Sequence, residues 1–279
     1  MPRRTGTDPS PDGRATSVNQ DNETSKQRRQ RLIKERVIEE GSCSPQRLAE
    51  LFGVSLMTIH RDLDDLEARG LVRKFHGGVT AQPSGVFESQ MSYRMSTHLE
   101  QKQRIAAHAL QHVAPGMSLI LDDSTTALQM IPGLADLMPL HVAAPSLPAL
   151  HQLAEIAAHR DLTILGLGGT YDRRHESFVG MQCIEQVEGI HADAVFMSMS
   201  AVSGLYTYHQ EDGIVALKRA MLRAATKRYL LVDSSKLGIS ALHRAIPLDA
   251  FDIVITDDGV APEVLADWKP NGITFEVAA

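Results

Sequence analysis

The sequence of 279 residues has only two cysteines, Cys43 and Cys183, and no long run of apolar residues. Two cysteines cannot build a disulfide framework, and these two show no metal-ligand spacing, so we expect a reducing interior. No apolar run reaches the roughly eighteen residues of a membrane span, and the N-terminus has no apolar signal core. These absences predict a cytoplasmic protein that has no membrane partner.

Motifs of several enzyme and metal classes are also missing. The sequence has no Gly-x-Ser-x-Gly nucleophile elbow and no P-loop ending in Gly-Lys-Ser/Thr. Among its twelve histidines, only His108 and His112 are one helical turn apart, and no Cys or third His follows them at ligand spacing. We therefore predict no catalytic residue, no metal and no cofactor.

Charge is distributed unevenly along the chain, whose formal net charge is −6. Residues 26–80 hold eleven Lys or Arg and eight Asp or Glu, whereas the residues from Ala81 onward hold fourteen and twenty-two. A locally basic module on an acidic body is typical of a protein in which only the module meets nucleic acid.

The stretch from Ser44 to Arg69 predicts two helices joined by a tight turn. Ser44 is placed to cap a helix that begins at Pro45, where a missing N–H costs nothing. Gly53 suits the positive φ that ends this helix, and Ser55 is placed as a second N-cap. The second helix has one apolar stripe, formed by Ile59, Leu63 and Leu66. Such a pair is either an ordinary surface helix pair or a DNA-binding helix-turn-helix.

The flanking segments favour the second interpretation. A basic helical pattern from Lys26 to Glu40 adds a third helix, and Leu71 to Ala81 reads as a hairpin with basic residues, which is typical of a wing. Residues 1–25 are polar and read as a disordered tail, residues 26–81 as a winged helix-turn-helix, and residues 82–97 as a linker. A second domain then occupies residues 98–279.

This second domain is predicted to be an α/β domain with a mostly parallel sheet. Its apolar runs alternate with helical or loop segments, a pattern that places helices over both faces of a parallel sheet. Ligands of such sheets bind at the carboxyl ends of the strands. The predicted strands are Ser118–Leu121, His141–Ala144, Leu162–Leu167, Ala194–Met199, Tyr229–Val232 and Asp252–Thr256.

Polar residues and glycines follow several of these strands. Ser124, Thr125 and Thr126 open a helix, where free N–H groups and hydroxyls can bind a phosphate or a sugar hydroxyl, or form a plain N-cap. Gly168 and Gly169 permit close backbone approach to a ligand or form a tight turn. Lys236 would meet an anionic ligand as a point charge, unless it is an ordinary surface lysine.

Two runs make the sequence similar to a known family. Thr58-Ile59-His60-Arg61-Asp62-Leu63 and Arg73-Lys74-Phe75-His76-Gly77-Gly78 resemble the winged helix-turn-helix of the DeoR family of bacterial transcriptional regulators. The resemblance extends from about Lys26 to Asp258. It implies a second domain similar in fold to ribose-5-phosphate isomerase and coenzyme A transferases, which senses a sugar phosphate or a related metabolite.

The resemblance also implies a set of effector-binding residues, all near strand ends. They are Asp122, Ser124, Thr125, Thr126, Ser146, Gly168, Gly169, Arg173, Asp233 and Lys236. This chain departs from the family pattern at four positions. His60 stands where the family usually has a second Arg, Ser124 where it has a Gly, and Ile214 where it has a Glu. Pro145 stands where the family has an Asn, so the side-chain amide and the backbone N–H of that position are both missing.

The resulting prediction is a DNA-binding regulator, most simply a repressor of a carbohydrate-catabolism operon, released by a phosphorylated sugar or a related metabolite. Its partners would be double-stranded operator DNA, the small effector and further copies of the chain in a homo-oligomer. The alternative is a sugar-phosphate isomerase-like enzyme fused to a DNA-binding module. The predicted DNA contacts are Arg28, Arg47, Ser55, Met57, Thr58, His60, Arg61, Lys74 and His76.

Overall fold

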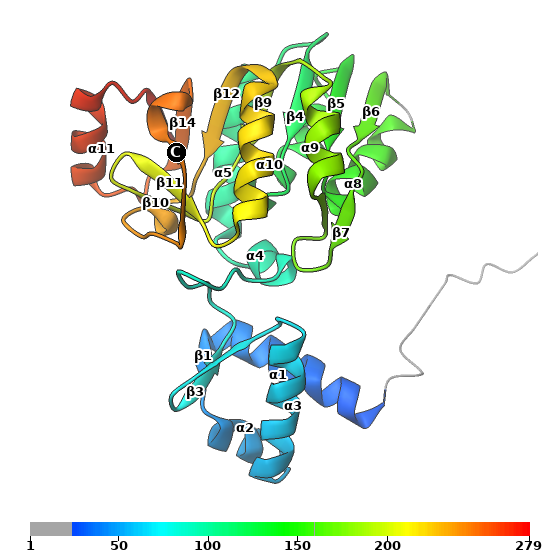
Figure 1. Ribbon diagram of the computed structural model, residues 1–279, viewed down its shortest axis with the longest axis vertical. Coiled ribbons are helices and arrows are strands. Elements are labelled where there is room, and N and C mark those ends of the chain that lie inside the picture. The colour runs from blue at the N-terminus through cyan, green and yellow to red at the C-terminus, as the bar shows by residue number, and fades with distance from the viewer. Residues whose placement is uncertain (1–23, 159) are drawn as a thin grey trace, which may run out of the picture.

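The computed structural model describes residues 24–158 and 160–279, and it has two parts joined by a short helix (Figure 1). The N-terminal module, blue to cyan, lies below the larger α/β domain in this view, and α4 (Met91–Ser96) lies between them. Most of the predicted tail, residues 1–23, lies outside the described residues. Thr24 caps the first helix.

The N-terminal module consists of three helices and a small antiparallel sheet. Its strands have the order β1-β3-β2, and its core joins all three helices to the sheet through Ile33, Leu48, Ile59, Leu63 and Val79. The prediction of a helix pair, a preceding basic helix and a wing is confirmed. The elements are α1 (Ser25–Glu40), β1 (Ser42–Cys43), α2 (Pro45–Phe52), α3 (Leu56–Ala68), β2 (Arg73–Phe75) and β3 (Gly78–Thr80).

The predicted caps form the turn between α2 and α3. Ser44 Oγ accepts a hydrogen bond from the N–H of Arg47 at 3.2 Å, and Gly53 ends α2 with φ 62°. Ser55 Oγ accepts from the N–H of Thr58 at 3.2 Å. Each cap satisfies a backbone N–H that has no partner inside its helix.

Replacing Ser55 with alanine is expected to destabilise α3 by about 1 kcal/mol, because the N–H of Thr58 loses its side-chain acceptor. Hydrogen exchange of the α3 amides in the absence of DNA measures this effect as about fivefold faster exchange. The matched control is Ser240→Ala, which removes an exposed hydroxyl from the other domain. Equal α3 exchange rates in the two variants would contradict the capping role.

A seven-stranded, fully parallel sheet forms the centre of the second domain, with the order β15-β14-β12-β9-β4-β5-β6. All six predicted strands are found in it. The edge strand β15 was not among the predicted strands. The bounds are β4 (Ser118–Leu121), β5 (Leu140–Ala144), β6 (Leu162–Gly166), β9 (Ala192–Met197), β12 (Ala225–Leu231), β14 (Ile253–Asp257) and β15 (Phe275–Ala278).

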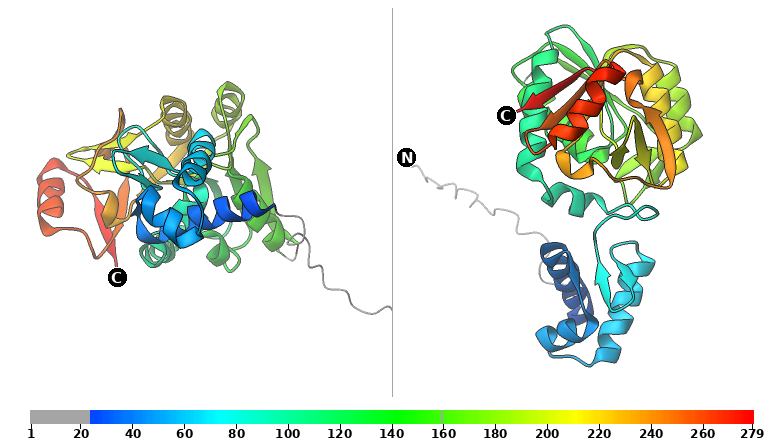
Figure 2. Two further views of the ribbon diagram at one scale, coloured as in Figure 1. Left: turned by 90° about the horizontal axis from the view of Figure 1, so that it is seen from below. Right: turned by 90° about the vertical axis from the view of Figure 1, so that its left-hand side faces the viewer.

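Helices cover both faces of this sheet (Figures 1 and 2). One face packs against α5 (Leu99–Ala109), α6 (Thr125–Leu128), α7 (Ile131–Leu134) and α8 (Leu147–Ala157). The other packs against α9 (Met181–Glu188), α10 (Asp212–Arg223) and α11 (Pro262–Trp268). The predicted α/β class with a parallel sheet is therefore confirmed.

Smaller elements connect the main ones. The strands β10, β11 and β13 form an antiparallel sheet, and β7 and β8 form a hairpin. Within the described residues, no helix combines the length and apolar character needed to cross a bilayer. The bounds are β7 (Thr170–Asp172), β8 (Ser177–Val179), β10 (Ala201–Ser203), β11 (Tyr206–His209), β13 (His243–Pro247), η1 (Leu110–His112), η2 (Ser234–Lys236), η3 (Leu248–Ala250) and η4 (Lys269–Asn271).

Candidate functional site

A cavity lies where the strand order reverses. The chain runs outward from β4 through β5 to β6 and then returns to place β9 on the other side of β4. Polar side chains after β4 and β9, including Ser124 and Ser198, line the cavity at this reversal. Asp233 and Lys236, which follow β12, line it as well. Switch points of parallel sheets are preferred places for small ligands.

The floor of the cavity is a buried group of ion pairs. Lys218, from α10, contacts Asp122 and lies 3.1 Å from Asp123 Oδ1, and all three side chains are at least 95% buried. Burial disfavours the charge of Lys218, but Asp122 and Asp123 outweigh it and raise its pKa. Asp122 also accepts hydrogen bonds from the N–H groups of Ser124 and Ser198, at 3.0 and 2.9 Å. This network holds the loops after β4 and β9 together.

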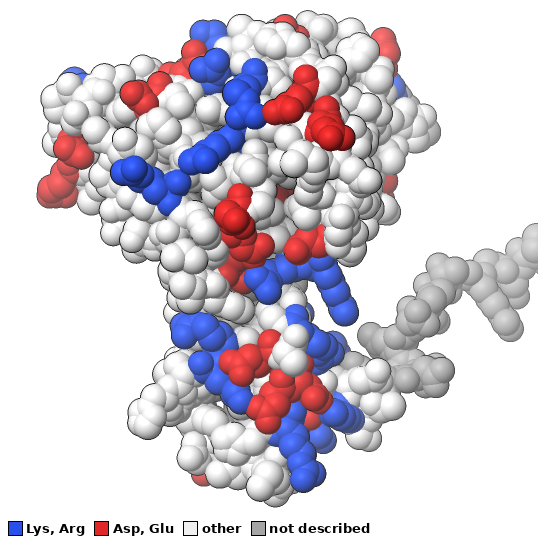
Figure 3. All heavy atoms as spheres, in the orientation of Figure 1, with Lys and Arg blue, Asp and Glu red and all other residues white. Residues whose placement is uncertain are grey.

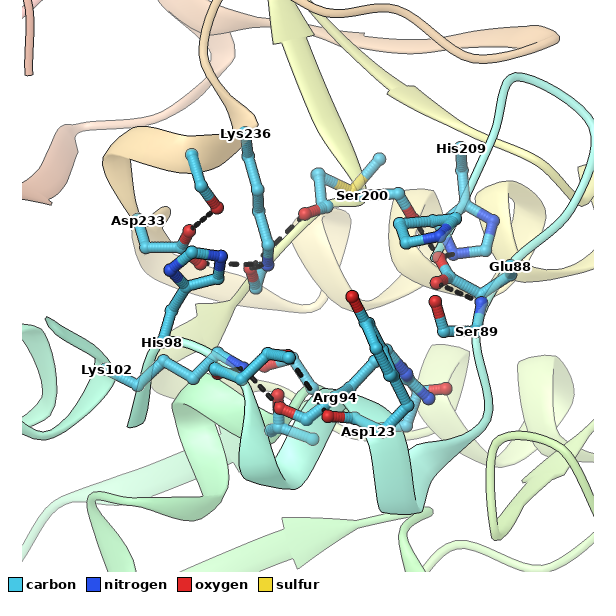
Figure 4. Close-up of a pocket in the computed structure, with 18 of the residues that line it drawn as sticks. Glu88, Ser89, Arg94, His98, Lys102, Asp123, Ser200, His209, Asp233 and Lys236 are labelled. Atoms are coloured by element: carbon cyan, nitrogen blue, oxygen red, sulfur yellow. Dashed lines mark hydrogen bonds and ion pairs between the residues drawn. The ribbon is translucent and has the colours of Figure 1, made fainter. Parts of the chain in front are cut away.

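Three cationic side chains and a histidine also line the cavity. Figure 4 shows Lys236, Lys102 and His98 on one side of the cavity, with Arg94 between them and Asp123. Lys236 Nζ lies 3.0 Å from Ser198 Oγ and 3.6 Å from Asp233 Oδ2. Lys102 Nζ donates to the carbonyl oxygens of Thr97, at 2.7 Å, and Arg94. The carboxylates that face these cations are Asp233, beside Lys236, and Glu88 and Asp123, whose pKa values the charge of Arg94 helps to lower.

Burial and the neighbouring charge act together on Lys102. Burial, and after it the charge of Lys236, lower the pKa of the Lys102 ammonium to about 7. On the other side of the cavity, burial raises the pKa of Glu88, but Arg94, His209, the Ser200 hydroxyl and His175 together outweigh it and hold that pKa below its usual range. An anion bound between Lys102 and Lys236 would relieve their mutual repulsion.

Four buried polar atoms of cavity-lining residues make no hydrogen bond within the described part of the chain. They are Ser89 Oγ, Arg94 Nε, Asp123 Oδ2 and Asp233 Oδ2, and the last of them has Lys236 Nζ 3.6 Å away. Since buried polar atoms are nearly always paired in native proteins, the oxygens of Ser89 and Asp233 are placed to bind the hydroxyls of a ligand.

Four of the ten predicted effector residues line this cavity, namely Ser124, Thr125, Asp233 and Lys236. Asp122 lies beneath it, paired with Lys218, and Thr126 is fully buried in α6. The other four lie elsewhere. Ser146 caps α8, Gly168 and Gly169 lie in the turn between β6 and β7, where the Gln186 side chain binds Gly168, and Arg173 follows β7.

The structure adds residues that the sequence reasoning missed. Many of them come from the segment interpreted as a linker, which contains α4 and contributes Glu88, Ser89, Tyr93 and Arg94 to the cavity. Buried Met91 anchors α4 in the core of the α/β domain. A further clue was available in Lys102, which lies on the apolar face of α5 and is only 3% exposed. A lysine on a buried helical face calls for a partner or a ligand.

Three of the positions that differ from the family pattern lie in different parts of the second domain. Ile214 is buried in α10, and nearby Glu211 pairs with Arg174 at 2.7 Å instead of contacting Lys218. Pro145 keeps only its carbonyl, which accepts from the N–H of Phe178 at 2.9 Å. Ser124 caps α6 by accepting from the N–H of Ala127 at 3.1 Å.

The second candidate site is the exposed side of α3. Ile59, Leu63 and Leu66 are buried, whereas Met57 is 63% exposed and His60 and Arg61 are exposed. No hydrogen bond or ion pair of Arg61 is found within the described residues. Asp62 is buried and accepts from Arg29 Nε at 2.6 Å, so it fastens α3 to α1.

The charges of the N-terminal module are mixed on the face drawn in Figure 3, where Lys and Arg alternate with Asp and Glu. Two of the four predicted phosphate contacts form ion pairs on this module. Lys74, in the wing, contacts Asp64, and Arg47 lies 2.9 Å from Glu40. Arg28 and His76 are exposed. Exposed pairs of this kind are weak and can be exchanged for DNA phosphates.

Comparison with known proteins covers both parts. Residues 97–258 match the DeoR C terminal sensor domain, and residues 29–84 match the DeoR-like helix-turn-helix domain. The putative aga operon transcriptional repressor of Escherichia coli O157:H7 is 28% identical over 255 residues, which cover 88% of this chain and 91% of that protein. The glycerol-3-phosphate regulon repressor of Escherichia coli (strain K12) is 28% identical over 250 residues, covering 88% and 96%.

Among solved structures, ribose 5-phosphate isomerase A from Methanocaldococcus jannaschii is 18% identical, with a TM-score of 0.38, and covers 50% of this chain and 55% of its own. The two bacterial relatives, in contrast, match nearly their whole length and are named as transcriptional repressors. The chain belongs to the DeoR family of transcriptional regulators, with an N-terminal DNA-binding domain and a C-terminal sensor domain.

Proposed function

We propose that a phosphorylated sugar, or a small anionic metabolite like it, binds in the cavity and releases this regulator from its operator. The observation that carries the proposal is the convergence of Arg94, Lys102 and Lys236 on one cavity at the switch point of the sheet. Ammonium and guanidinium groups form strong, charge-assisted hydrogen bonds with phosphate oxygens. The buried oxygens Asp233 Oδ2 and Ser89 Oγ, which accept no hydrogen bond within the described residues, are suited to sugar hydroxyls.

On the DNA side, the proposal places α3 in the major groove. Ser55, Met57, Thr58, His60 and Arg61 would face the bases, and Arg28, Arg47, Lys74 and His76 would hold phosphates. The guanidinium of Arg61, which is exposed and has no partner among the described residues, suits a bidentate contact to guanine, the commonest specific base contact. His60 has no such fork, which makes the base preference at its position a property of this chain.

α4 connects ligand binding in the cavity to DNA binding by α3. Tyr93 packs against the core of the N-terminal module and also lines the cavity, and Arg94 beside it faces the same cavity. Gln90 Nε2 donates a hydrogen bond to the carbonyl oxygen of Arg69, at the end of α3, at 3.2 Å. Lys34 Nζ, in α1, donates to Ser92 Oγ at 3.4 Å. A ligand that draws Arg94 toward itself would therefore move residues that support the DNA-binding module.

The biological role would be repression of a carbohydrate-catabolism operon in the cytoplasm. Two relatives of this chain are named as a putative aga operon transcriptional repressor and as the glycerol-3-phosphate regulon repressor. One module of this size reads a short half-site, so specific binding calls for a homo-oligomer held together by the sensor domains. A thermal-shift screen of the full chain against sugar phosphates tests the ligand class, because a ligand of the folded state raises its melting temperature.

Effector affinity is expected to fall by about fivefold between pH 7 and pH 8. With a pKa of about 7, Lys102 of the free protein is losing its proton in this range, while a bound phosphate favours the charged form. Binding therefore takes up a proton, and its affinity is highest below pH 7. Calorimetry in buffers of different ionisation enthalpy measures that uptake. Lys102→Arg, whose charge does not titrate here, should flatten the profile, and a flat wild-type profile would contradict this role of Lys102.

The enzyme alternative has less support from the geometry. Four residues, Asp122, Asp123, Asp212 and Lys236, are the acid/base groups that such an enzyme could use. Asp122 and Asp123 are buried against Lys218, Asp212 is exposed at the start of α10, and Lys236 lines the cavity. Our proposal is therefore a sensor that has no catalytic residue. An isomerisation assay over pentose and hexose phosphates separates the two, since turnover would overturn the sensor.

A further inference from the structure

The side chains of His108, His112 and Glu276 meet between the end of α5 and the edge strand β15. The Nε2 atoms of His108, in α5, and of His112, in η1, each lie 2.8 Å from Oε2 of Glu276. All three atoms lie within 4.8 Å of one another. Glu276 is 164 residues from His112 in the sequence, so spacing along the chain could not reveal this cluster.

We propose that this cluster binds a divalent transition metal, with Zn²⁺ as the best match. Two imidazole nitrogens and one carboxylate oxygen are a typical three-residue ligand set for Zn²⁺, in which a fourth position stays open to water. Oxygen-preferring ions such as Mg²⁺ suit this set poorly.

The present distances fit this use after a small adjustment. Ligands about 2.1 Å from a tetrahedral Zn²⁺ are about 3.4 Å from one another, so each nitrogen must move away from Glu276 Oε2 by about 0.6 Å. Rotation of the carboxylate and of the two rings provides this shift. The side chains are 21–32% exposed, which leaves a path for the ion and room for a water ligand.

An aromatic stack holds one of the ligands in place. The His112 ring lies 4.8 Å from the Tyr229 ring, which is stacked on Phe196 at 4.6 Å in the core of the sheet. The chain offers a contrast in His151 and Glu155, which are also one helical turn apart. Their separation is 3.8 Å, and their side chains are 76% and 69% exposed. Of these two groups, the one formed by His108, His112 and Glu276 has three possible ligands and a histidine ring that is held by stacking.

A metal at this place would tie β15 to α5. Since β15 is paired on one side only and α5 carries Lys102 at its other end, the ion would fasten the edge of the sheet to the helix that lines the cavity. Metal binding to the folded state is then expected to raise the melting temperature of the protein.

The test is calorimetric titration of the EDTA-treated full chain with ZnCl₂. Wild type is expected to bind one Zn²⁺ at a saturable site, and Glu276→Gln and His108→Gln are each expected to lower the affinity at least about 100-fold. His151→Gln is the matched control and should bind like wild type. Circular dichroism and operator binding establish that each variant is folded.

Two further measurements use wild type alone, so they do not depend on the folding of a variant. Co²⁺ in this site should give the intense visible absorption of a tetrahedral complex, and Zn²⁺ but not Mg²⁺ should raise the melting temperature. The proposal is overturned if wild type shows no saturable site and no Co²⁺ band. It is also overturned if folded Glu276→Gln and His108→Gln bind Zn²⁺ like wild type.

Discussion

Replacing Arg61 with alanine is expected to weaken operator binding by about 1–3 kcal/mol, or about 5- to 150-fold, and to relax the preference for one base pair. The physical reason is that Arg61 stands exposed on α3, while the opposite side of the helix is fixed by the buried Ile59, Leu63 and Leu66. Since Arg61 has no hydrogen bond or ion pair within the described residues, its guanidinium breaks no such contact when it enters the major groove. Fluorescence anisotropy with the operator and with single-base variants of it measures both effects.

The control for this experiment is Arg223→Ala, which removes an exposed arginine of α10 that pairs with Glu188 at 2.8 Å. It should leave operator affinity and base preference unchanged. Lys74→Ala, in contrast, is expected to weaken binding similarly on all sequences and to lower the salt dependence by about one unit of slope. If Arg61→Ala keeps full discrimination between operator variants, Arg61 does not read a base.

Lys236→Ala is expected to leave operator binding intact and to raise the effector concentration needed for release by about 10- to 150-fold. Lys236 donates to Ser198 Oγ at 3.0 Å at the rim of the cavity, far from α3, and its loss removes one charge-assisted bond to the anion, a loss of about 1.5–3 kcal/mol. The measurement is the effector concentration that halves the anisotropy signal of the operator complex.

Lys269→Ala is the matched control, because Lys269 is an exposed lysine in η4 outside the cavity. It should behave like wild type in both operator binding and release. Normal release of Lys236→Ala by the same effector would remove Lys236 from the binding site, and equal defects in the two variants would show an effect of net charge alone.

Much of the fold follows from local chemistry. The caps at Ser44 and Ser55, the turn at Gly53 and the apolar stripe of α3 depend on neighbours in the sequence, and the structure confirms them. The six alternating apolar runs likewise become the inner strands and one edge of the parallel sheet. β15 was not predicted, because its four residues are too few to show a clear pattern of apolar and polar side chains.

The cavity was harder to predict because its walls come from distant parts of the chain. Strand ends gave Ser124, Thr125, Asp233 and Lys236, for which the rule about carboxyl ends sufficed. Arg94 belongs to a segment without periodicity, and its place depends on α4 packing across the strand ends. The same limit applies to Glu276, which only the order of the sheet brings next to the helix of His108.

The central claim is that an anionic sugar bound in the cavity releases the protein from DNA. The most direct measurement is anisotropy of the wild-type operator complex, titrated with a panel of sugar phosphates and with the corresponding free sugars. We predict release by at least one phosphorylated compound and none by its unphosphorylated form. Release by the free sugar at equal concentration, or by no phosphorylated compound in the panel, would contradict the claim.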